Sequence, residues 1–130
     1  MSKVKFDDDF EQMTHSFRDI DQVKFLIRSH QRVVIISSNQ IVVLTANGPY
    51  TNIVLASGKS LTMSKPLKYY ERQLQGANFY RCHKSHLVNL NYFTEFNIIK
   101  RKAIFSGIEI PISRRNQSEF IKIIYDNFTT

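Results

Sequence analysis

The amino-acid sequence predicts a mostly β protein, with antiparallel sheets of about eight to ten short strands, an N-terminal helix and a C-terminal helix. Short runs of β-branched and aromatic residues recur from Val23 onward, and turn-forming residues separate most of them. These runs follow one another without long helical crossovers, and strands joined by tight turns pair antiparallel. The chain has 130 residues, which suits one domain with its own hydrophobic core.

Residues 1–21 are predicted to form an acidic, amphipathic leader helix ahead of the domain at 22–130. The apolar positions of the leader are Phe6, Phe10, Met13, Phe17 and Ile20. Their spacing of four, three, four and three residues is helical periodicity. The stripe either docks on the chain's own domain or contacts a partner, such as a second copy in a dimer.

Strands are predicted at 23–27, 32–36, 41–44, 50–56, 60–63, 92–99, 103–105 and 108–112. Tight turns are predicted between several of them, at Asn47-Gly48-Pro49, Ser57-Gly58-Lys59 and Ser106-Gly107. Asn and Gly tolerate the positive φ that such turns need, and Pro fixes the next φ.

Two further helices are predicted. The first covers 67–74, with Pro66 at or near its first position and Gly76 closing it. The second covers 116–128, with Ser113 ahead of it as a candidate N-cap. One apolar stripe runs along this helix, formed by Phe120, Ile123, Ile124 and Phe128.

Charge is distributed unevenly along the chain. Residues 1–21 hold six acidic and three basic side chains, a net charge of −3, whereas residues 22–130 hold 15 basic and five acidic ones, a net charge of +10. A body this basic favours a polyanionic partner, most often a nucleic acid. The plainer alternative is a basic protein with a solvated surface.

Enzymatic and metal-binding functions are disfavoured. Cys82 is the only cysteine, so the chain has neither an intramolecular disulfide nor a paired-cysteine metal knuckle. His83 and His86 are metal-ligand types, but no second cluster completes a four-ligand set. The five carboxylates after residue 21 are widely spaced, whereas nucleases cluster them around a divalent ion. We expect no catalysis, no metal and no cofactor.

The sequence also predicts a cytoplasmic location. No apolar run approaches the ~18 residues of a membrane span, and the first residues lack the apolar core of a signal peptide. A single cysteine fits a reducing compartment.

The stretch 79–90, Phe-Tyr-Arg-Cys-His-Lys-Ser-His-Leu-Val-Asn-Leu, combines core-forming residues with exposed polar ones. Its polar side chains are donors of the kinds that bind phosphate oxygens and base edges, and it contains no acidic residue. No helix-turn-helix pair is visible in the sequence. If the chain binds DNA, loops between strands would therefore make many of the contacts with the bases.

These residues, in their order and spacing, resemble the LytTR DNA-binding domain of bacterial transcription regulators. The resemblance covers about residues 23–125. It is carried, in chain order, by Asn47 to Ile53, Gly58-Lys59, Leu67 with Glu71 and Leu74, the stretch 79–90, and Glu109 to Arg115. It implies antiparallel sheets whose loops enter successive major grooves of double-stranded DNA at direct repeats in promoters. It leaves a homodimer and tandem copies on the repeats as alternatives. Most such domains follow a receiver domain of response regulators, for which 130 residues leave no room, so control by phosphorylation is not inferred.

The same resemblance implies that Tyr50, Lys84 and Arg115 face the bases. Arg114 stands beside Arg115 at the head of a predicted helix, where positive charge opposes the helix dipole and would suit approaching phosphates. Arg81 and His83 lie on one side of a strand and either contact DNA or pair within the fold. Four residues at hairpin tips are candidates for phosphate-backbone contacts: Lys59, Lys100, Arg101 and Lys102.

A rival interpretation is an RNA-binding, single-strand-binding or protein-interaction module that uses the same basic β surface. Single-strand binders place aromatic side chains among basic ones on one sheet face. The tyrosines that would serve are Tyr69, Tyr70, Tyr80 and Tyr92.

Overall fold

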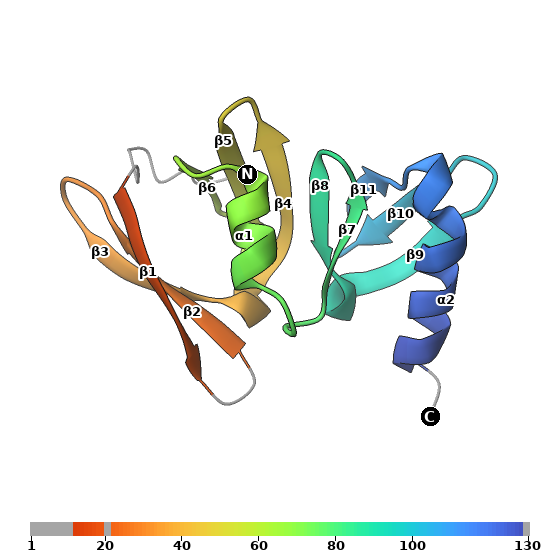
Figure 1. Ribbon diagram of the computed structural model, residues 1–130, viewed down its shortest axis with the longest axis horizontal. Helices are drawn as coiled ribbons and strands as arrows, with labels where there is room; N and C mark the ends of the chain where they lie inside the picture. The colour runs from red at the N-terminus through yellow and green to blue at the C-terminus, as the bar shows by residue number, and fades with distance from the viewer. Residues whose placement is uncertain (1–11, 20–21, 129–130) are drawn as a thin grey trace.

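The computed structural model describes residues 12–19 and 22–128, which form three antiparallel sheets and two α-helices (Figure 1). The first sheet, in the order β1-β2-β3, consists of Gln12–Asp19 (β1), Gln22–Arg28 (β2) and Val33–Ser37 (β3). The central sheet, in the order β6-β5-β4-β8-β7, consists of Ile41–Asn47 (β4), Tyr50–Leu55 (β5), Ser60–Met63 (β6), Phe79–His83 (β7) and His86–Asn89 (β8). The third sheet, in the order β11-β10-β9, consists of Phe93–Asn97 (β9), Lys102–Phe105 (β10) and Ile108–Pro111 (β11).

The helices are Leu67–Gln73 (α1) and Gln117–Phe128 (α2). Within the described ranges, three short 3-10 helices connect strands or lead into α2: Ser38–Gln40 (η1), Leu90–Tyr92 (η2) and Arg114–Asn116 (η3). The mostly β, antiparallel fold predicted from the sequence is confirmed.

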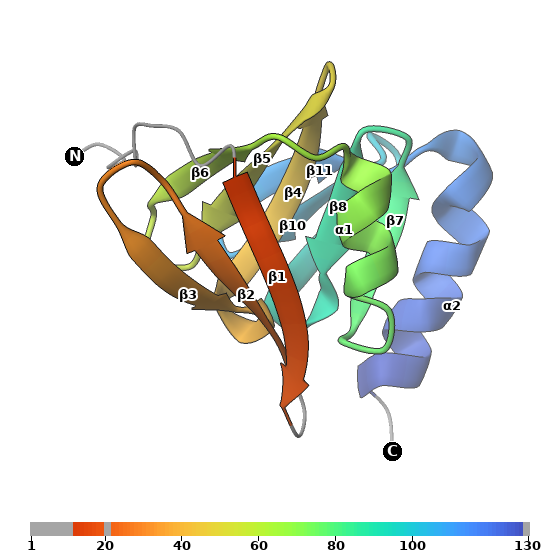
Figure 2. The same ribbon diagram turned by 60° about the vertical axis from the view of Figure 1, so that its left-hand side comes forward.

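The central sheet is packed on both faces, as the two views in Figures 1 and 2 show. One face packs on the first sheet and α1, and we call this contact the first core. The other face packs on the third sheet and α2, and we call this contact the second core. In β4, Ile41 and Leu44 belong to the first core, whereas Val42 and Val43 belong to the second. A strand covered on both faces needs a continuous apolar run, which explains the sequence Ile-Val-Val-Leu.

The hairpin turns follow the predicted chemistry. Ser106 and Gly107, between β10 and β11, have φ of 52° and 84°, the two positive values of a type I′ turn. Gly48, in the turn between β4 and β5, has φ of 61°. These turns bring sequential strands together, and the turn residues themselves lie outside the core.

The predicted N-terminal helix is not confirmed. Its residues Gln12–Asp19 are strand β1, which pairs antiparallel with β2, while residues 1–11 and 20–21 lie outside the described residues. Ser16 bonds Gln73, and Arg18 bonds the backbone oxygen of Gln75. Thr, His, Ser and Phe in this segment are weak helix formers, so pairing with β2 outweighs the local periodicity.

The strand predicted at 92–99 is shorter than expected. Leu90–Tyr92 is η2, β9 covers Phe93–Asn97, and Ile98 and Ile99 stand in the following turn. Ser113 precedes η3, but its side chain makes no capping hydrogen bond. Both differences concern the segments that border the candidate site.

Candidate nucleic-acid interface

Two hairpin turns of the central sheet lie at the same edge of the molecule. Thr45, near the end of β4, is paired with His86 at the start of β8. The backbone oxygen of Ser85 also accepts a hydrogen bond from the Ala46 amide at 2.9 Å. The β4–β5 and β7–β8 turns therefore project side by side, at the top of Figure 1.

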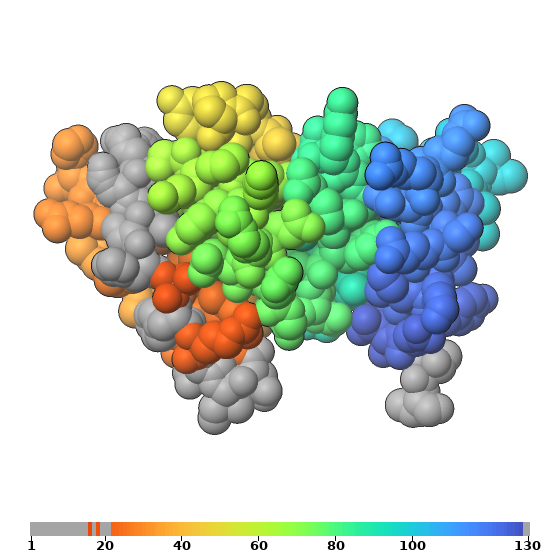
Figure 3. Space-filling model, in the orientation of Figure 1, coloured from red at the N-terminus to blue at the C-terminus, as the bar shows by residue number. Residues whose placement is uncertain are grey.

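Two segments that border the third sheet extend this edge. The Ser113 amide, just before η3, donates to the Cys82 oxygen of β7 at 3.0 Å. The Ile112 amide donates to the Arg101 oxygen in the β9–β10 turn at 2.9 Å. We call the four segments 47–50, 83–86, 98–102 and 113–116 the loop edge. In Figure 3 the tips of these segments follow one another along the upper margin of the molecule.

A groove on the loop edge, with a volume of about 420 Å³, lies between the β7–β8 turn and η3. We call it the basic groove; it is lined by Arg81, His83, Lys84, Ser113, Arg115 and Asn116. Lys84 and Arg115 are both exposed. The structure thus places two of the predicted base-facing residues in one groove, although 30 intervening residues separate them in the chain.

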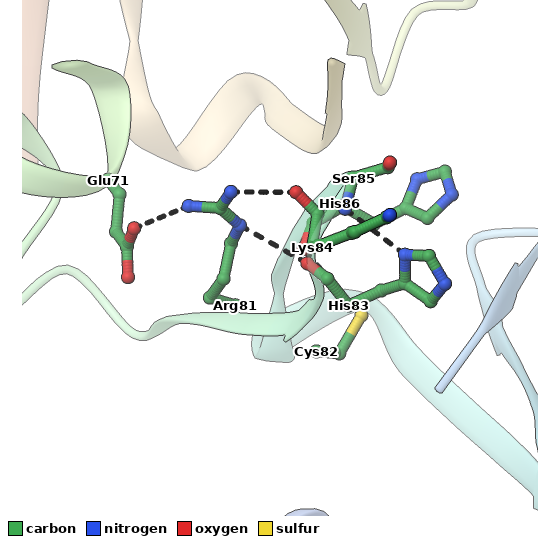
Figure 4. Close-up of polar contacts among 7 residues, drawn as sticks. All are labelled: Glu71, Arg81, Cys82, His83, Lys84, Ser85 and His86. Atoms are coloured by element: carbon green, nitrogen blue, oxygen red, sulfur yellow. Dashed lines mark hydrogen bonds and ion pairs between the residues drawn. The ribbon is translucent and has the colours of Figure 1, made fainter. Parts of the chain in front are cut away.

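Arg81 pairs within the fold. Its Nη1 lies 2.6 Å from Glu71 Oε1 of α1, its Nε donates to the His83 oxygen at 3.1 Å, and its Nη2 donates to the Lys84 oxygen at 2.7 Å (Figure 4). A planar guanidinium matches these three acceptors, which an ammonium could not do. Arg81 therefore shapes the turn that carries Lys84.

The two histidines of the β7–β8 hairpin also support it. His83 Nδ1 accepts from the Ser85 amide at 3.1 Å, and His86 Nδ1 lies 3.1 Å from Thr45 Oγ1. Their ring centroids are 5.3 Å apart. Burial, and then the neighbouring His83, lower the pKa of His86 below its ordinary value of 6.5. His86 is thus held as a neutral hydrogen-bonding group.

Sequence reasoning missed two residues that line the basic groove. Ser113 Oγ is buried, and no described residue offers it a hydrogen-bond partner. Asn116 ends η3, and its amide donates to the Ser113 oxygen at 3.0 Å. Their position beside Arg114 and Arg115 was the available signal, but the groove exists only because η3 packs beside the β7–β8 turn, which is a tertiary feature.

The remaining predicted residues divide between two ends of the central sheet. Tyr50 is 49% exposed at the head of β5, in the β4–β5 turn. Arg114, Lys100, Arg101 and Lys102 also belong to the loop edge. Lys59 lies in the β5–β6 turn, at the opposite end of β5, and a strand of that length spans about 20 Å. The structure does not bring Lys59 to the loop edge.

Cys82 is buried in the core between the central and third sheets, and burial raises its pKa to about 12. Its thiol therefore stays protonated at neutral pH, which is the unreactive form. Among residues 12–19 and 22–128 no group of three or more His, Cys, Asp or Glu side chains could hold a metal ion. No helix within the described part of the chain is long and apolar enough to cross a membrane.

Comparisons with known proteins agree with this architecture. The sensory transduction protein LytT of Bacillus subtilis (strain 168) is 28% identical over 119 residues, which are 88% of this chain and 47% of LytT. The chain thus spans about half the length of that relative. A solved LytTr DNA-binding domain of a response regulator from Bacillus cereus has a TM-score of 0.64 and 21% identity, covering 80% of this chain and 96% of that domain, and it shows the same fold. The sequence profile of the LytTr DNA-binding domain matches residues 31–124, more than half of the chain. The chain therefore belongs to the LytTR family of DNA-binding domains.

Proposed function

We propose that this domain binds double-stranded DNA in a sequence-specific manner, as the DNA-reading module of a bacterial transcription regulator. Lys84 and Arg115 reach base edges from the basic groove, and Tyr50 contacts DNA from the neighbouring β4–β5 turn. Arg114, Lys100, Arg101 and Lys102 bind phosphates on either side. His83 contributes a polar wall to the basic groove, and Arg81 holds the β7–β8 turn in position.

The charge of the loop edge supports a polyanionic partner. Its four segments contain six basic residues and no Asp or Glu. Glu71, which bonds Arg81, has its charge compensated by that guanidinium. A duplex laid along the loop edge would therefore meet cations and hydrogen-bond donors without an opposing carboxylate in these segments.

The observation that carries the proposal is that Lys84 and Arg115 line one groove. Both are long donors of the types that bind guanine N7 and O6 in a major groove, and Arg can do so with two parallel bonds. Tyr50 lies on the same edge, in the neighbouring β4–β5 turn. The β4–β5 turn and the basic groove can therefore enter successive major grooves of one duplex. That arrangement suits binding at direct repeats, either by tandem copies or by a homodimer.

The test begins with selection of bound duplexes from a random pool. On the selected duplex we expect Arg115→Ala and Lys84→Ala each to lose about tenfold or more of the ratio between specific and random binding, because a good base contact contributes about 1–3 kcal/mol of discrimination. Lys59→Ala, at the far end of the central sheet, is the matched control. An unchanged ratio in Arg115→Ala would remove Arg115 from base recognition.

Single-stranded RNA is the runner-up partner, and the tyrosines argue against it. Tyr70 is buried in the first core, Tyr80 donates its hydroxyl to Glu119 at 2.8 Å, and Tyr92 donates to the Asn39 oxygen at 2.6 Å. These rings come from different layers and do not form one stacking platform. Competition between the selected duplex and single-stranded RNA at fixed salt should favour the duplex.

Three accompanying properties belong to the same proposal. As a module that only binds DNA, the domain catalyses no reaction of its own. It needs no cofactor, and it acts in the cytoplasm, where bacterial promoters are accessible.

A further inference from the structure

Two apolar surfaces lie at opposite ends of the longest axis of the molecule (Figure 1). One is the outer side of the first sheet, at the left of the figure, and the other lies between β9 and α2, at the right. The loop edge runs along the top of the molecule between these ends. The two surfaces therefore stand on either side of the proposed DNA-binding surface.

The surface on the first sheet is apolar and cationic. Val33 and Ile35 of β3 are 60% and 52% exposed, whereas Ile36 between β3 and the central sheet is buried in the first core. Arg28, at the exposed end of β2, is paired with Val33, so both side chains lie on the same side of the sheet. Residues 22–37 contain three cations and no Asp or Glu. We call the surface formed by Arg28, Val33 and Ile35 the β3 face.

The second surface is a groove of about 340 Å³ between β9 and α2. We call it the α2 groove, and its apolar walls are Phe93, Phe96, Ile98, Ile121, Ile124 and Tyr125. Glu95 also lines the groove, and this carboxylate is exposed. The α2 groove thus combines an apolar hollow with a negative charge, whereas the β3 face combines apolar side chains with a positive charge.

A second copy of this chain is the partner that accounts for both surfaces at once. Each surface supplies the charge that the other lacks, and exposed β-branched side chains on one match an apolar hollow on the other. A partner of different sequence would account for only one of them. It would also leave unexplained why the two complementary surfaces lie on opposite sides of the loop edge.

We propose that the β3 face of one copy docks in the α2 groove of a second copy bound beside it on the same duplex, with Val33 and Ile35 in the groove and Arg28 against Glu95. This inference rests on the proposed function, because DNA brings the copies together. Each copy contributes a different surface, so the contact is head-to-tail and keeps both copies in the same orientation. Because the surfaces lie at opposite ends of the long axis, the loop edges of the two copies continue along one line.

The contact is too small to hold free copies together. Stable protein interfaces bury about 1,200–2,000 Å² in total, whereas here two aliphatic side chains and one charge pair enter a single groove. Copies bound side by side on one duplex have an effective concentration on the order of mM, at which a weak contact forms. The docking is therefore a source of cooperative binding to DNA.

The experiment compares duplexes that carry one selected site with duplexes that carry two, in the same or in inverted orientation, at spacings near one and two helical turns of about 10.5 base pairs. Cooperativity is the affinity of the second copy for a duplex that already holds the first, divided by the affinity for a single-site duplex. The variants, all outside the loop edge, are Arg28→Glu, Glu95→Arg and Ile35→Ser. Glu109→Arg is the matched control, because Glu109 and Glu95 are both paired with Ile104 but Glu109 does not line the α2 groove.

At one same-orientation spacing, the second wild-type copy should bind about tenfold more tightly or better, the factor expected when the exposed halves of two aliphatic side chains become buried. Arg28→Glu, Glu95→Arg and Ile35→Ser should each bind a single site like the wild type, which also shows that they are folded, and should lose this factor. Glu109→Arg should keep it.

Mixing the variants tests whether the charges meet between copies. An equimolar mixture of Arg28→Glu and Glu95→Arg copies should recover the cooperativity, because the exchanged charges again face each other across one contact. A mixture of Arg28→Glu and Glu109→Arg copies, which has the same total charge, should not recover it.

The docking would be overturned if the wild type filled two sites without cooperativity at every spacing, or equally well on inverted sites, which indicates a two-fold contact. It would also be overturned if Ile35→Ser stayed cooperative, if the first mixture stayed non-cooperative, or if the charge variants changed single-site affinity alone, which would assign them to DNA. If the wild type selected no duplex at all, the proposed function itself would fail, and that result is distinct from the others.

Discussion

Arg81 and Lys84 are three residues apart in one basic stretch, yet their side chains have different surroundings. Arg81 has its guanidinium occupied by Glu71 and two backbone oxygens, while Lys84 is exposed in the basic groove. Both are cations in the sequence, and only their hydrogen-bond partners separate them. The difference can be tested with a substitution that keeps the charge.

Arg81→Lys should lower the free energy of unfolding by about 1–2 kcal/mol, because an ammonium cannot reproduce three directed bonds at a half-exposed site. It should also weaken specific DNA binding by loosening the turn that carries Lys84. Urea unfolding and duplex titration measure the two effects. Glu71→Gln, which keeps an acceptor for Arg81, is the milder control. An Arg81→Lys variant of wild-type stability that nevertheless lost DNA binding would indicate direct contact between Arg81 and DNA.

Tyr70 carries a buried hydroxyl for which no described residue is a hydrogen-bond partner, and burial raises its pKa. Tyr70→Phe removes the uncompensated polar group and keeps the ring that packs against Phe25 and Tyr69. We expect unfolding to cost about 1 kcal/mol more in this variant. Tyr80→Phe should do the opposite, since it deletes the bond to Glu119. Equal effects of the two changes in chemical denaturation would contradict this account.

His86 links stability to pH. Its folded pKa lies below 6.5, so on acidification the unfolded chain takes up this proton before the folded chain does. The stability that neutral His86 contributes is present above its unfolded pKa and is lost as the pH falls through its folded pKa. Between about pH 7.5 and pH 5.5, the wild type should lose more unfolding free energy than His86→Asn, which has no titrating ring. If the unfolding free energy changed equally with pH in both proteins, His86 would not be the source of this pH dependence.

At the scale of elements, α2 is anchored at its beginning by Phe120, its one buried side chain. Phe120 is fully buried, and its ring lies 5.1 Å from that of Phe96 and 5.8 Å from that of Phe93, measured between centroids. The Tyr80 ring stacks on it at 5.9 Å. This cluster seats the helix that follows η3, so it also sets where Arg115 stands.

Phe120→Ala should lower the free energy of unfolding by about 3–5 kcal/mol, the range for emptying a buried aromatic site. Phe128→Ala, at the exposed end of the same helix, should cost much less because Phe128 is 55% exposed. Chemical denaturation of both variants gives the comparison. A similar cost at both positions would mean that α2 is not anchored at its beginning.

At the scale of the whole molecule, the loop edge and the far end of the central sheet should differ in their response to salt. Lys100→Ala removes a cation from the loop edge and should weaken binding to all duplexes, with the salt slope smaller by about one unit. Lys59→Ala should leave the slope unchanged, because the β5–β6 turn lies about a strand's length away. Affinities at several salt concentrations decide this, and equal slope changes would show that the duplex is not confined to the loop edge.

Much of this architecture follows from local signals. Turn residues such as Asn47-Gly48 and Ser106-Gly107 mark where strands reverse, and β-branched runs mark the strands between them. The segment around β1 is the exception, because its helical spacing was a real local pattern that pairing with β2 outweighed. For the site, Lys84, Arg115 and Tyr50 were nominated by residue type and family resemblance. Their shared edge was not visible in the sequence.

Three features can be read from the chain alone: the strand pattern, the basic charge of residues 22–130 and the side chains with donors suited to DNA. They depend only on composition and on neighbours within a few positions. Three others depend on the fold: Lys84 and Arg115 line one groove, Arg81 is paired with Glu71, and Lys59 lies at the other end of the central sheet. Those outcomes depend on how β4 pairs with β8 and how η3 is tied to β7, contacts between residues far apart in the chain. Side-chain chemistry is local, whereas the direction in which a loop points is set by the packing of all the layers beneath it.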